Sequence, residues 1–159
     1  MDALLDHAVP VRPGEELDLP AVDAFLKAKI PGLEGQPELT QFPGGVSNLT
    51  YCLQYPNRRL ILRRPPFGHR AKSAHDMLRE ARVMSALKPV YRYVPTVVAS
   101  VEDEAVMGCE FYLMDPIPGI ILRQDLPAGL ALSGEDTRRL CLNALDRLIE
   151  LHQVLPDAP

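Results

Sequence analysis

The stretch Gly44-Gly45-Val46-Ser47-Asn48-Leu49-Thr50-Tyr51 decides the fold, because it joins a glycine-containing loop directly to a β-strand. From Leu49 to Tyr55, apolar and polar residues alternate, which is typical of a half-buried strand. Residues 38–42 precede the glycines with strand-forming side chains, and residues 60–63 follow a Pro56-Asn57 turn. The sequence therefore predicts a three-stranded antiparallel meander with the glycine loop at its first turn.

A helix and a second hairpin are expected after this meander. Apolar residues at helical spacing predict a helix over about residues 74–87, with Ser73 and Asp76 as a capping box. Strand-forming residues follow at 96–101 and 110–114, on either side of an acidic turn. The order β-β-β-α-β-β predicts an α+β fold in which one helix packs on a five-stranded antiparallel sheet.

Helices are also expected toward both ends of the chain. Asp18 before Leu19-Pro20 favours a helix start, whereas residues 1–17 lack periodicity and are typical of an arm. Ser133 and Asp136 predict the cap of a long amphipathic helix near the other end. The apolar face of that helix comprises Leu140, Ala144, Leu145, Leu148, Leu151 and His152. The sequence offers no segment of comparable size to cover this face, so we expect its packing surface to come from later sequence or from another chain.

Composition and charge exclude several classes of protein. The chain has 159 residues, 47% of them hydrophobic, which is enough for one domain with a core. Its net charge of -4 provides no broad basic surface for nucleic acid, and no apolar run approaches the ~20 residues that span a bilayer. The three cysteines show neither zinc-binding nor disulfide spacing. We therefore expect a cytoplasmic protein without nucleic-acid or membrane partners.

The glycine loop is the first candidate for a binding site. The backbone N–H groups of Gly44 and Gly45 can approach an anion closely, and the side chains of Ser47 and Asn48 add donors. A nucleotide phosphate is the natural ligand for such a loop. A Gly-Gly turn between strands is also typical of an ordinary hairpin, so the loop alone does not decide between the two interpretations.

Arg63 and Glu80 are the other candidates. Alternation places Arg63 on the same sheet face as Ile61, where a cation must be paired or bind an anion; the alternative is a strand-end arginine that extends to water. Glu80 lies at the margin of the apolar stripe of its helix, and Arg63 is its expected partner. A glycine loop, a strand cation and a helix carboxylate, in this order, are typical of the nucleotide-holding unit of protein-kinase-like enzymes.

These motifs carry a resemblance that extends from Gly44 to His152. The sequence resembles the aminoglycoside phosphotransferase-like kinase superfamily, in the branch related to the kinase domain of acyl-CoA dehydrogenase-fused proteins. The matching stretches are Gly44 to Tyr51, Leu62 to Pro66, Ala74 to Asp76 continuing to Arg79-Glu80, Phe111 to Met114 before Gly119, and Leu151-His152. The resemblance implies a protein-kinase-like N-lobe that binds ATP, with Arg63 clamping the phosphates and Glu80 orienting Arg63.

The resemblance also implies a hinge and a division of the chain. The Asp115 carbonyl would accept a hydrogen bond from the adenine amino group, and the Ile117 N–H would donate to the adenine ring. Residues 1–35 would form an arm and a helix, and residues 36–116 the nucleotide-binding lobe. Residues 117–159 would then supply the hinge, a linker and the first helix of a C-terminal lobe.

The catalytic elements of this family are not found in the sequence. Such kinases use a His-Gly-Asp-type loop to orient the attacking hydroxyl, and an Asn and a second Asp to hold Mg²⁺. None of the four histidines is followed by Gly-Asp, and there is no Asp-Phe-Gly motif. We therefore expect no catalytic residue in this chain, the Mg²⁺ ligands in a C-terminal lobe beyond it, and no activity from the chain alone.

Two functions are compatible with these features. The first is an ATP-dependent phosphotransferase that acts on a small-molecule hydroxyl, of which this chain is the nucleotide-binding part. The alternative is a non-catalytic interaction or regulatory module built on a kinase-like N-lobe. Its C-terminal helix would then bind a partner, for example a second copy in a homodimer. Binding of ATP–Mg²⁺ distinguishes the two.

Overall fold

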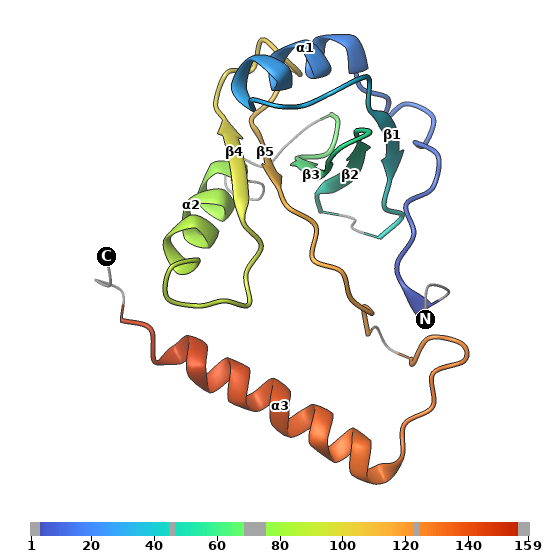
Figure 1. The fold of residues 1–159 in the computed structure, drawn as a ribbon, viewed down its shortest axis with the longest axis vertical. Coiled ribbons are helices and arrows are strands. Elements are labelled where there is room, and N and C mark those ends of the chain that lie inside the picture. Colours follow the sequence, from blue (N-terminus) through green and yellow to red (C-terminus); the bar gives the residue numbers. More distant parts are fainter. Residues whose placement is uncertain (1–3, 45–46, 69–75, 123–124, 156–159) are drawn as a thin grey trace.

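The computed structural model describes residues 4–44, 47–68, 76–122 and 125–155, and it contains a five-stranded antiparallel sheet (Figure 1). The strands are β1 (Glu38–Gln41), β2 (Leu49–Gln54), β3 (Arg59–Arg64), β4 (Val97–Val101) and β5 (Phe111–Met114). Their order across the sheet is β1-β2-β3-β5-β4. The predicted sheet is confirmed, and the expected meander forms its first three strands.

The register of the sheet decides which side chains share a face. Arg63 on β3 lies opposite Thr50 on β2 and Tyr112 on β5. Because side chains alternate along a strand, these three residues point to one face, and their neighbours Leu62 and Leu113 point to the other.

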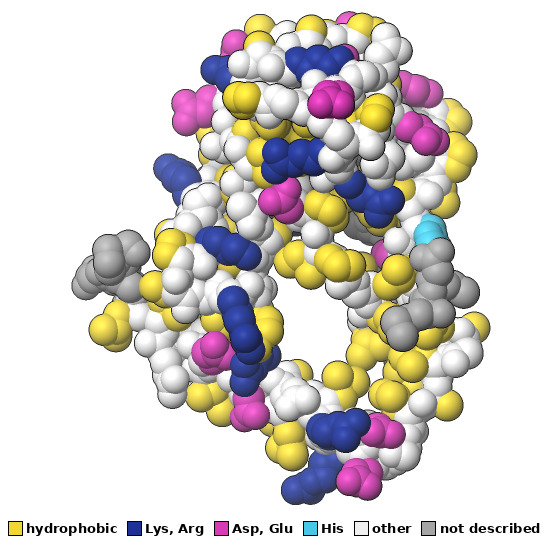
Figure 2. Space-filling view, in the orientation of Figure 1, with side chains coloured by type: hydrophobic (Ala, Val, Ile, Leu, Met, Phe, Trp, Pro, Cys, Tyr) yellow, Lys and Arg dark blue, Asp and Glu magenta, His cyan; other side chains and the backbone are white. Residues whose placement is uncertain are grey.

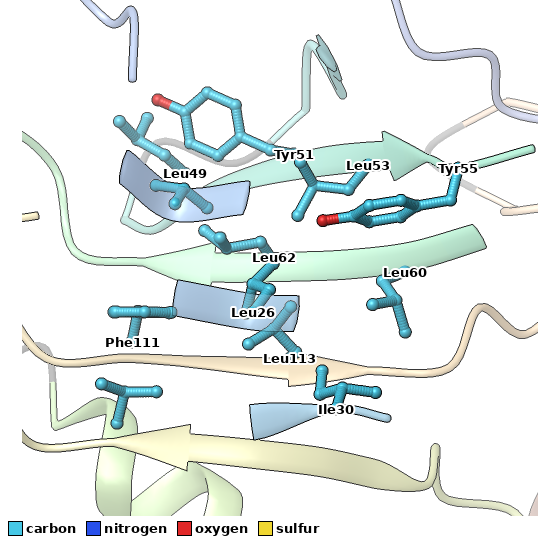
Figure 3. Close-up of a cluster of buried hydrophobic side chains, with 12 residues drawn as sticks. Leu26, Ile30, Leu49, Tyr51, Leu53, Tyr55, Leu60, Leu62, Phe111 and Leu113 are labelled. Carbon is cyan, nitrogen blue, oxygen red and sulfur yellow. The ribbon is translucent and has the colours of Figure 1, made fainter. Parts of the chain in front are cut away.

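Helix α1 (Leu19–Lys29) packs on the face that carries the main hydrophobic core (Figure 3). Asp18 caps its first turn, as predicted. Val22 and Leu26 are fully buried in the same cluster as strand residues. The strand residues of this cluster are Leu49, Tyr51, Leu53, Leu60, Leu62, Val101, Phe111 and Leu113. This corrects the expectation of a single packed helix. Helix α1, which the sequence prediction groups with the arm in residues 1–35, shares the core of the sheet.

Helix α2 (Met77–Leu87) packs on the opposite face, beside β4 and β5. Its buried residues Met77 and Ala81 contact Tyr112. The helix begins at Met77 rather than near residue 74, because the Asp76 side chain caps it by accepting from the Arg79 N–H. Ser73, the other member of the predicted capping box, lies outside the described residues.

Helix α3 (Gly134–His152) extends away from the sheet, and none of its residues is buried. Ser133 caps it as predicted, accepting from the Asp136 N–H. Its contact with the lobe is polar: the Tyr91 hydroxyl donates to the Arg147 carbonyl, and Arg147 Nη1 donates to the Tyr93 hydroxyl. Figure 2 shows an opening between α3 and the sheet, with hydrophobic side chains on its rim. Within the described ranges, no helix has the length and apolar character needed to cross a membrane.

Candidate functional site

A cleft of about 880 Å³ lies between the glycine loop, the sheet and the segment that follows β5. Gly44 lines it from the loop, and Asp115 and Ile117 line it from the segment after β5. The structure thus brings three of the predicted site residues to one cavity. Ser47 is exposed at the end of the loop, and Gly45 lies outside the described residues.

The floor of the cleft is formed by sheet side chains. Thr50, Ile61 and Met114 come from three adjacent strands and line the cavity. These side chains present mainly carbon and methyl groups, so the floor suits a flat, largely apolar ring better than a charged group.

The segment after β5 offers polar main-chain groups at the edge of this floor. The Asp115 N–H donates to the Thr96 carbonyl at 2.9 Å, which extends the pairing of β5 with β4 to this residue. Pro116 and Pro118 have no N–H. Ile117 therefore holds the one backbone donor between them, at the position where the resemblance places the adenine contact.

An ion pair fixes the start of this segment. Arg58, in the turn between β2 and β3, contacts the Asp115 carboxylate at 2.9 Å. Both side chains are about two-fifths exposed (37% and 42%), so the pair is screened by water. It leaves the Asp115 carbonyl as the group with which this residue could bind a ligand in the cleft.

Arg63 and Glu80 form the ion pair that the sequence predicted. Arg63 Nη1 lies 3.4 Å from Glu80 Oε2, and the two side chains are 30% and 37% exposed. Arg63 Nε is buried and has no hydrogen-bond partner among the described residues. The side chain is nevertheless partly exposed, so its remaining N–H groups are suited to bind an additional anion.

Two further donors, which the sequence pattern does not connect with Glu80, hold this carboxylate. Asn48 Nδ2 donates to Oε1 at 3.0 Å, and the Tyr112 hydroxyl donates to Oε2 at 3.0 Å. Burial raises the pKa of Tyr112 to about 12, so the hydroxyl keeps its proton at neutral pH. Arg63 lowers this pKa and Glu80 raises it, both by smaller amounts.

The position of Asn48 differs from the one expected. The sequence predicts that its amide binds the phosphates, together with the glycines and Ser47. In the structure the amide donates to Glu80, and the residue is only 7% exposed. The alternation of β2 could not reveal this contact, because Asn48 precedes the strand and its partner lies 32 residues away.

The N-terminal arm also contributes to the cleft, although its sequence shows no periodicity. Leu5 and Asp6 line the cavity. Val9 forms an isolated antiparallel bridge with Gln41 of β1, and the buried Gln41 side chain accepts from the Arg12 N–H. The arm therefore runs along the edge of the sheet, as Figure 1 shows.

The described residues contain no group of three or more His, Cys, Asp or Glu side chains that could hold a metal ion. Glu80 is occupied by three partners, and Asp115 is paired with Arg58. The part of the chain that the structure describes therefore supplies contacts for an anion and a flat ring, and no metal-binding centre.

Comparison with known proteins assigns this arrangement to a family. The sequence profile of the phosphotransferase enzyme family matches residues 38–159, from the first residue of β1 onward. The chain belongs to the phosphotransferase enzyme family. The family resemblance predicted from the motifs is confirmed.

Relatives and a solved structure of this phosphotransferase-family chain agree with the assignment. The chain is 36% identical over 146 residues to acyl-CoA dehydrogenase family member 10 of Mus musculus, covering 91% of this chain and 14% of that protein. It is 30% identical over 148 residues to family member 11 of Homo sapiens, covering 91% of this chain and 19% of that protein. A crystal structure from Ralstonia eutropha, provisionally assigned as an aminoglycoside phosphotransferase, matches with a TM-score of 0.58 and 30% identity. That match covers 73% of this chain and 32% of the other.

These matches confirm the kinase-like N-lobe fold. The chain spans only 14% and 19% of the length of these two curated relatives. It therefore corresponds to a small part of each of them.

Proposed function

We propose that this chain binds ATP and forms the nucleotide-binding lobe of an enzyme that transfers the γ-phosphoryl group to a small-molecule hydroxyl. The observation that supports this most is the Arg63–Glu80 pair in a phosphotransferase-family chain, with Arg63 paired across the sheet with Thr50 of the cleft floor. Arg63 has a buried Nε without a hydrogen-bond partner among the described residues. A guanidinium that is held by a carboxylate and still has free donors is suited to bind phosphate oxygens.

Each part of the cleft has a role in this proposal. The adenine ring would lie on the floor formed by Thr50, Ile61 and Met114. The Asp115 carbonyl and the Ile117 N–H would bind its edge, and Gly44 would approach the phosphates through its backbone. Mg²⁺ would neutralise phosphate charge, with protein ligands from outside the described residues. The chain contributes binding and orientation, and we expect the group that activates the acceptor hydroxyl to come from elsewhere.

Calorimetric titration of ATP–Mg²⁺ tests the proposal. Arg63→Ala is expected to weaken binding about tenfold or more, because it removes charge-assisted hydrogen bonds to phosphate. Arg79→Ala is the matched control: it removes the same charge from an exposed position next to Glu80, and affinity should change less than about twofold. Equal affinities for the wild type and Arg63→Ala would refute the assignment of Arg63.

The same titration separates this proposal from the alternative of a non-catalytic interaction module. Weak but saturable binding to the wild-type chain supports the nucleotide-binding lobe. Absence of binding at millimolar ATP–Mg²⁺ supports the interaction module, because the cleft would then not be a nucleotide site. The exposed leucines of α3 would be the surface to examine in that case.

A further inference from the structure

Glu80 is held by three groups that come from three different parts of the lobe. Asn48 ends the glycine loop just before β2, Tyr112 lies on β5, and Arg63 lies on β3. Each carboxylate oxygen accepts at least one hydrogen bond: Oε1 from Asn48, and Oε2 from Tyr112. The ion pair with Arg63 is therefore one of three contacts that fix this carboxylate.

The geometry of these contacts shows which of them set the position of Glu80. The distance between Arg63 Nη1 and Glu80 Oε2 is 3.4 Å, longer than the roughly 2.7–2.9 Å of a strong charge-assisted bond. About a third of each of these two side chains is exposed, so water screens their attraction. The bonds from Asn48 and Tyr112 are shorter, at 3.0 Å, and come from residues that are 7% and 0% exposed. The hydrogen bonds from these two neutral donors therefore constrain Glu80 more than the ion pair with Arg63 does.

We infer that Asn48 and Tyr112 are positioning residues that hold Glu80 against Arg63, and that Asn48 thereby couples the glycine loop to helix α2. The role of this positioning in ATP binding rests on the proposed function. With Glu80 fixed, Arg63 keeps its remaining exposed N–H groups for the phosphates. Without the two donors, Glu80 could rotate toward water, and Arg63 would be free to follow it.

The neighbouring arginine shows that this arrangement is specific to one face of the sheet. Arg64 points to the opposite face, where it is 2% exposed and lies 3.7 Å from the centre of the Phe67 ring. Arg63 instead lies on the face that carries Thr50 and Tyr112, with its guanidinium carbon 6.0 Å from the Tyr112 ring centre. Adjacent cations thus have separate roles, one in packing and one beside Glu80.

Tyr112→Phe and Asn48→Ala test the inference, with Tyr55→Phe as the matched control. The Tyr55 hydroxyl is also buried and also donates to a carboxylate, Asp23 Oδ1, at 2.9 Å, but it lies in the other core cluster. We expect Tyr112→Phe and Asn48→Ala each to weaken ATP–Mg²⁺ binding about three- to tenfold. Tyr55→Phe should leave affinity within about twofold, even where it lowers thermal stability to a similar extent.

A second background separates positioning from general destabilisation. If Tyr112 acts through Glu80, Tyr112→Phe should have almost no further effect on affinity once Glu80→Ala is present. A full additional loss of affinity in that background would overturn the inference. So would equal losses from Tyr112→Phe and Tyr55→Phe in the wild-type background.

NMR of the nucleotide-free protein provides a readout that does not depend on ATP. The Nε–H signal of Arg63 should shift or broaden in Tyr112→Phe and Asn48→Ala, and should stay unchanged in Tyr55→Phe. If the wild type does not bind ATP, the proposed function fails, and this signal still decides whether the two residues hold Glu80 and Arg63 in place. An Arg63 signal unaffected by both substitutions would overturn the positioning role even if ATP binds.

Discussion

Replacing Gln41 with alanine is expected to release the N-terminal arm while the sheet stays folded. Gln41 is only 1% exposed, and its side chain joins β1 to the arm. Its Oε1 accepts from the Arg12 N–H at 3.0 Å, and its Nε2 donates to the Glu15 carboxylate. Its backbone also exchanges two hydrogen bonds of 2.8 Å with Val9. The substitution removes these side-chain contacts. It leaves the backbone pair, the bond from the Tyr51 hydroxyl to the Glu15 carbonyl at 2.7 Å, and the packing of Val11 against the core.

The size of the effect follows from these two side-chain bonds. A bond to a main-chain N–H contributes about 1 kcal/mol, and a bond to a carboxylate about 1.5–3 kcal/mol. The Glu15 side chain is 26% exposed and also contacts Arg12, so the lower part of that range applies. The loss of about 2–3 kcal/mol corresponds to roughly a 30- to 150-fold increase in the population of the opened arm.

Amide hydrogen exchange measures this opening directly. Exchange at the Val9 N–H, which donates to the Gln41 carbonyl, should accelerate by the factor above. Gln54→Ala is the matched control, because Gln54 also makes two side-chain hydrogen bonds, to the Tyr55 carbonyl and from Arg59 Nε, but does not touch the arm. If both substitutions change Val9 exchange equally, the proposed anchoring of the arm is refuted.

Two further predictions concern the core and its tyrosines. Leu26→Ala should lower the free energy of unfolding in urea by about 2–5 kcal/mol, because α1 shares the core of the sheet. The exposed neighbour substitution Lys27→Ala should cost less than about 1 kcal/mol, and similar losses from both would contradict the packing of α1. In an absorbance titration, Tyr51 and Tyr112 should ionise near pH 12, since burial raises the pKa of each to about 12. Tyr93 should ionise at a lower pH than an ordinary tyrosine, because hydrogen bonding by Arg92 lowers its pKa. The unfolded state loses these two protons near pH 10, so stability should be unaffected by them below that pH and should fall as the pH rises through 12; a single folded-state midpoint near pH 10 would contradict this.

Local sequence patterns were sufficient for the strands and for the order of the candidate residues. Alternation identified β2, and the sheet register confirms that Arg63 and Leu62 point to opposite faces. The pair between Arg63 and Glu80 could be predicted, because a strand cation on an inward face needs an anion and the helix that follows offers one. The cap of α3 could also be predicted, from Ser133 and Asp136, because a cap is a contact within one helical turn.

Contacts between distant segments could not be read in this way. In the sequence, Asn48 is a polar residue beside glycines, and this pattern favours a phosphate ligand. In the fold, however, its Nδ2 lies 3.0 Å from Glu80 Oε1. Residues 1–17 likewise show no periodicity in the sequence. In the structure, Val9 nevertheless forms a bridge with Gln41 of β1, and Leu5 and Asp6 line the cleft. Periodicity reports which side of an element is apolar, and it carries no information on which other element will cover that side.

The sequence by itself determined the sheet and the pairing of a strand cation, Arg63, with a helix carboxylate, Glu80, because these depend on alternation, spacing and order along the chain. The tertiary structure alone decided that α1 completes the core, that the arm borders the cleft, and that Asn48 and Tyr112 hold Glu80. Those outcomes depend on strand register and on packing between segments more than 30 residues apart, as in the Asn48 and Tyr112 bonds to Glu80, each with a separation of 32 residues. Side chains at such separations meet only once the sheet has formed.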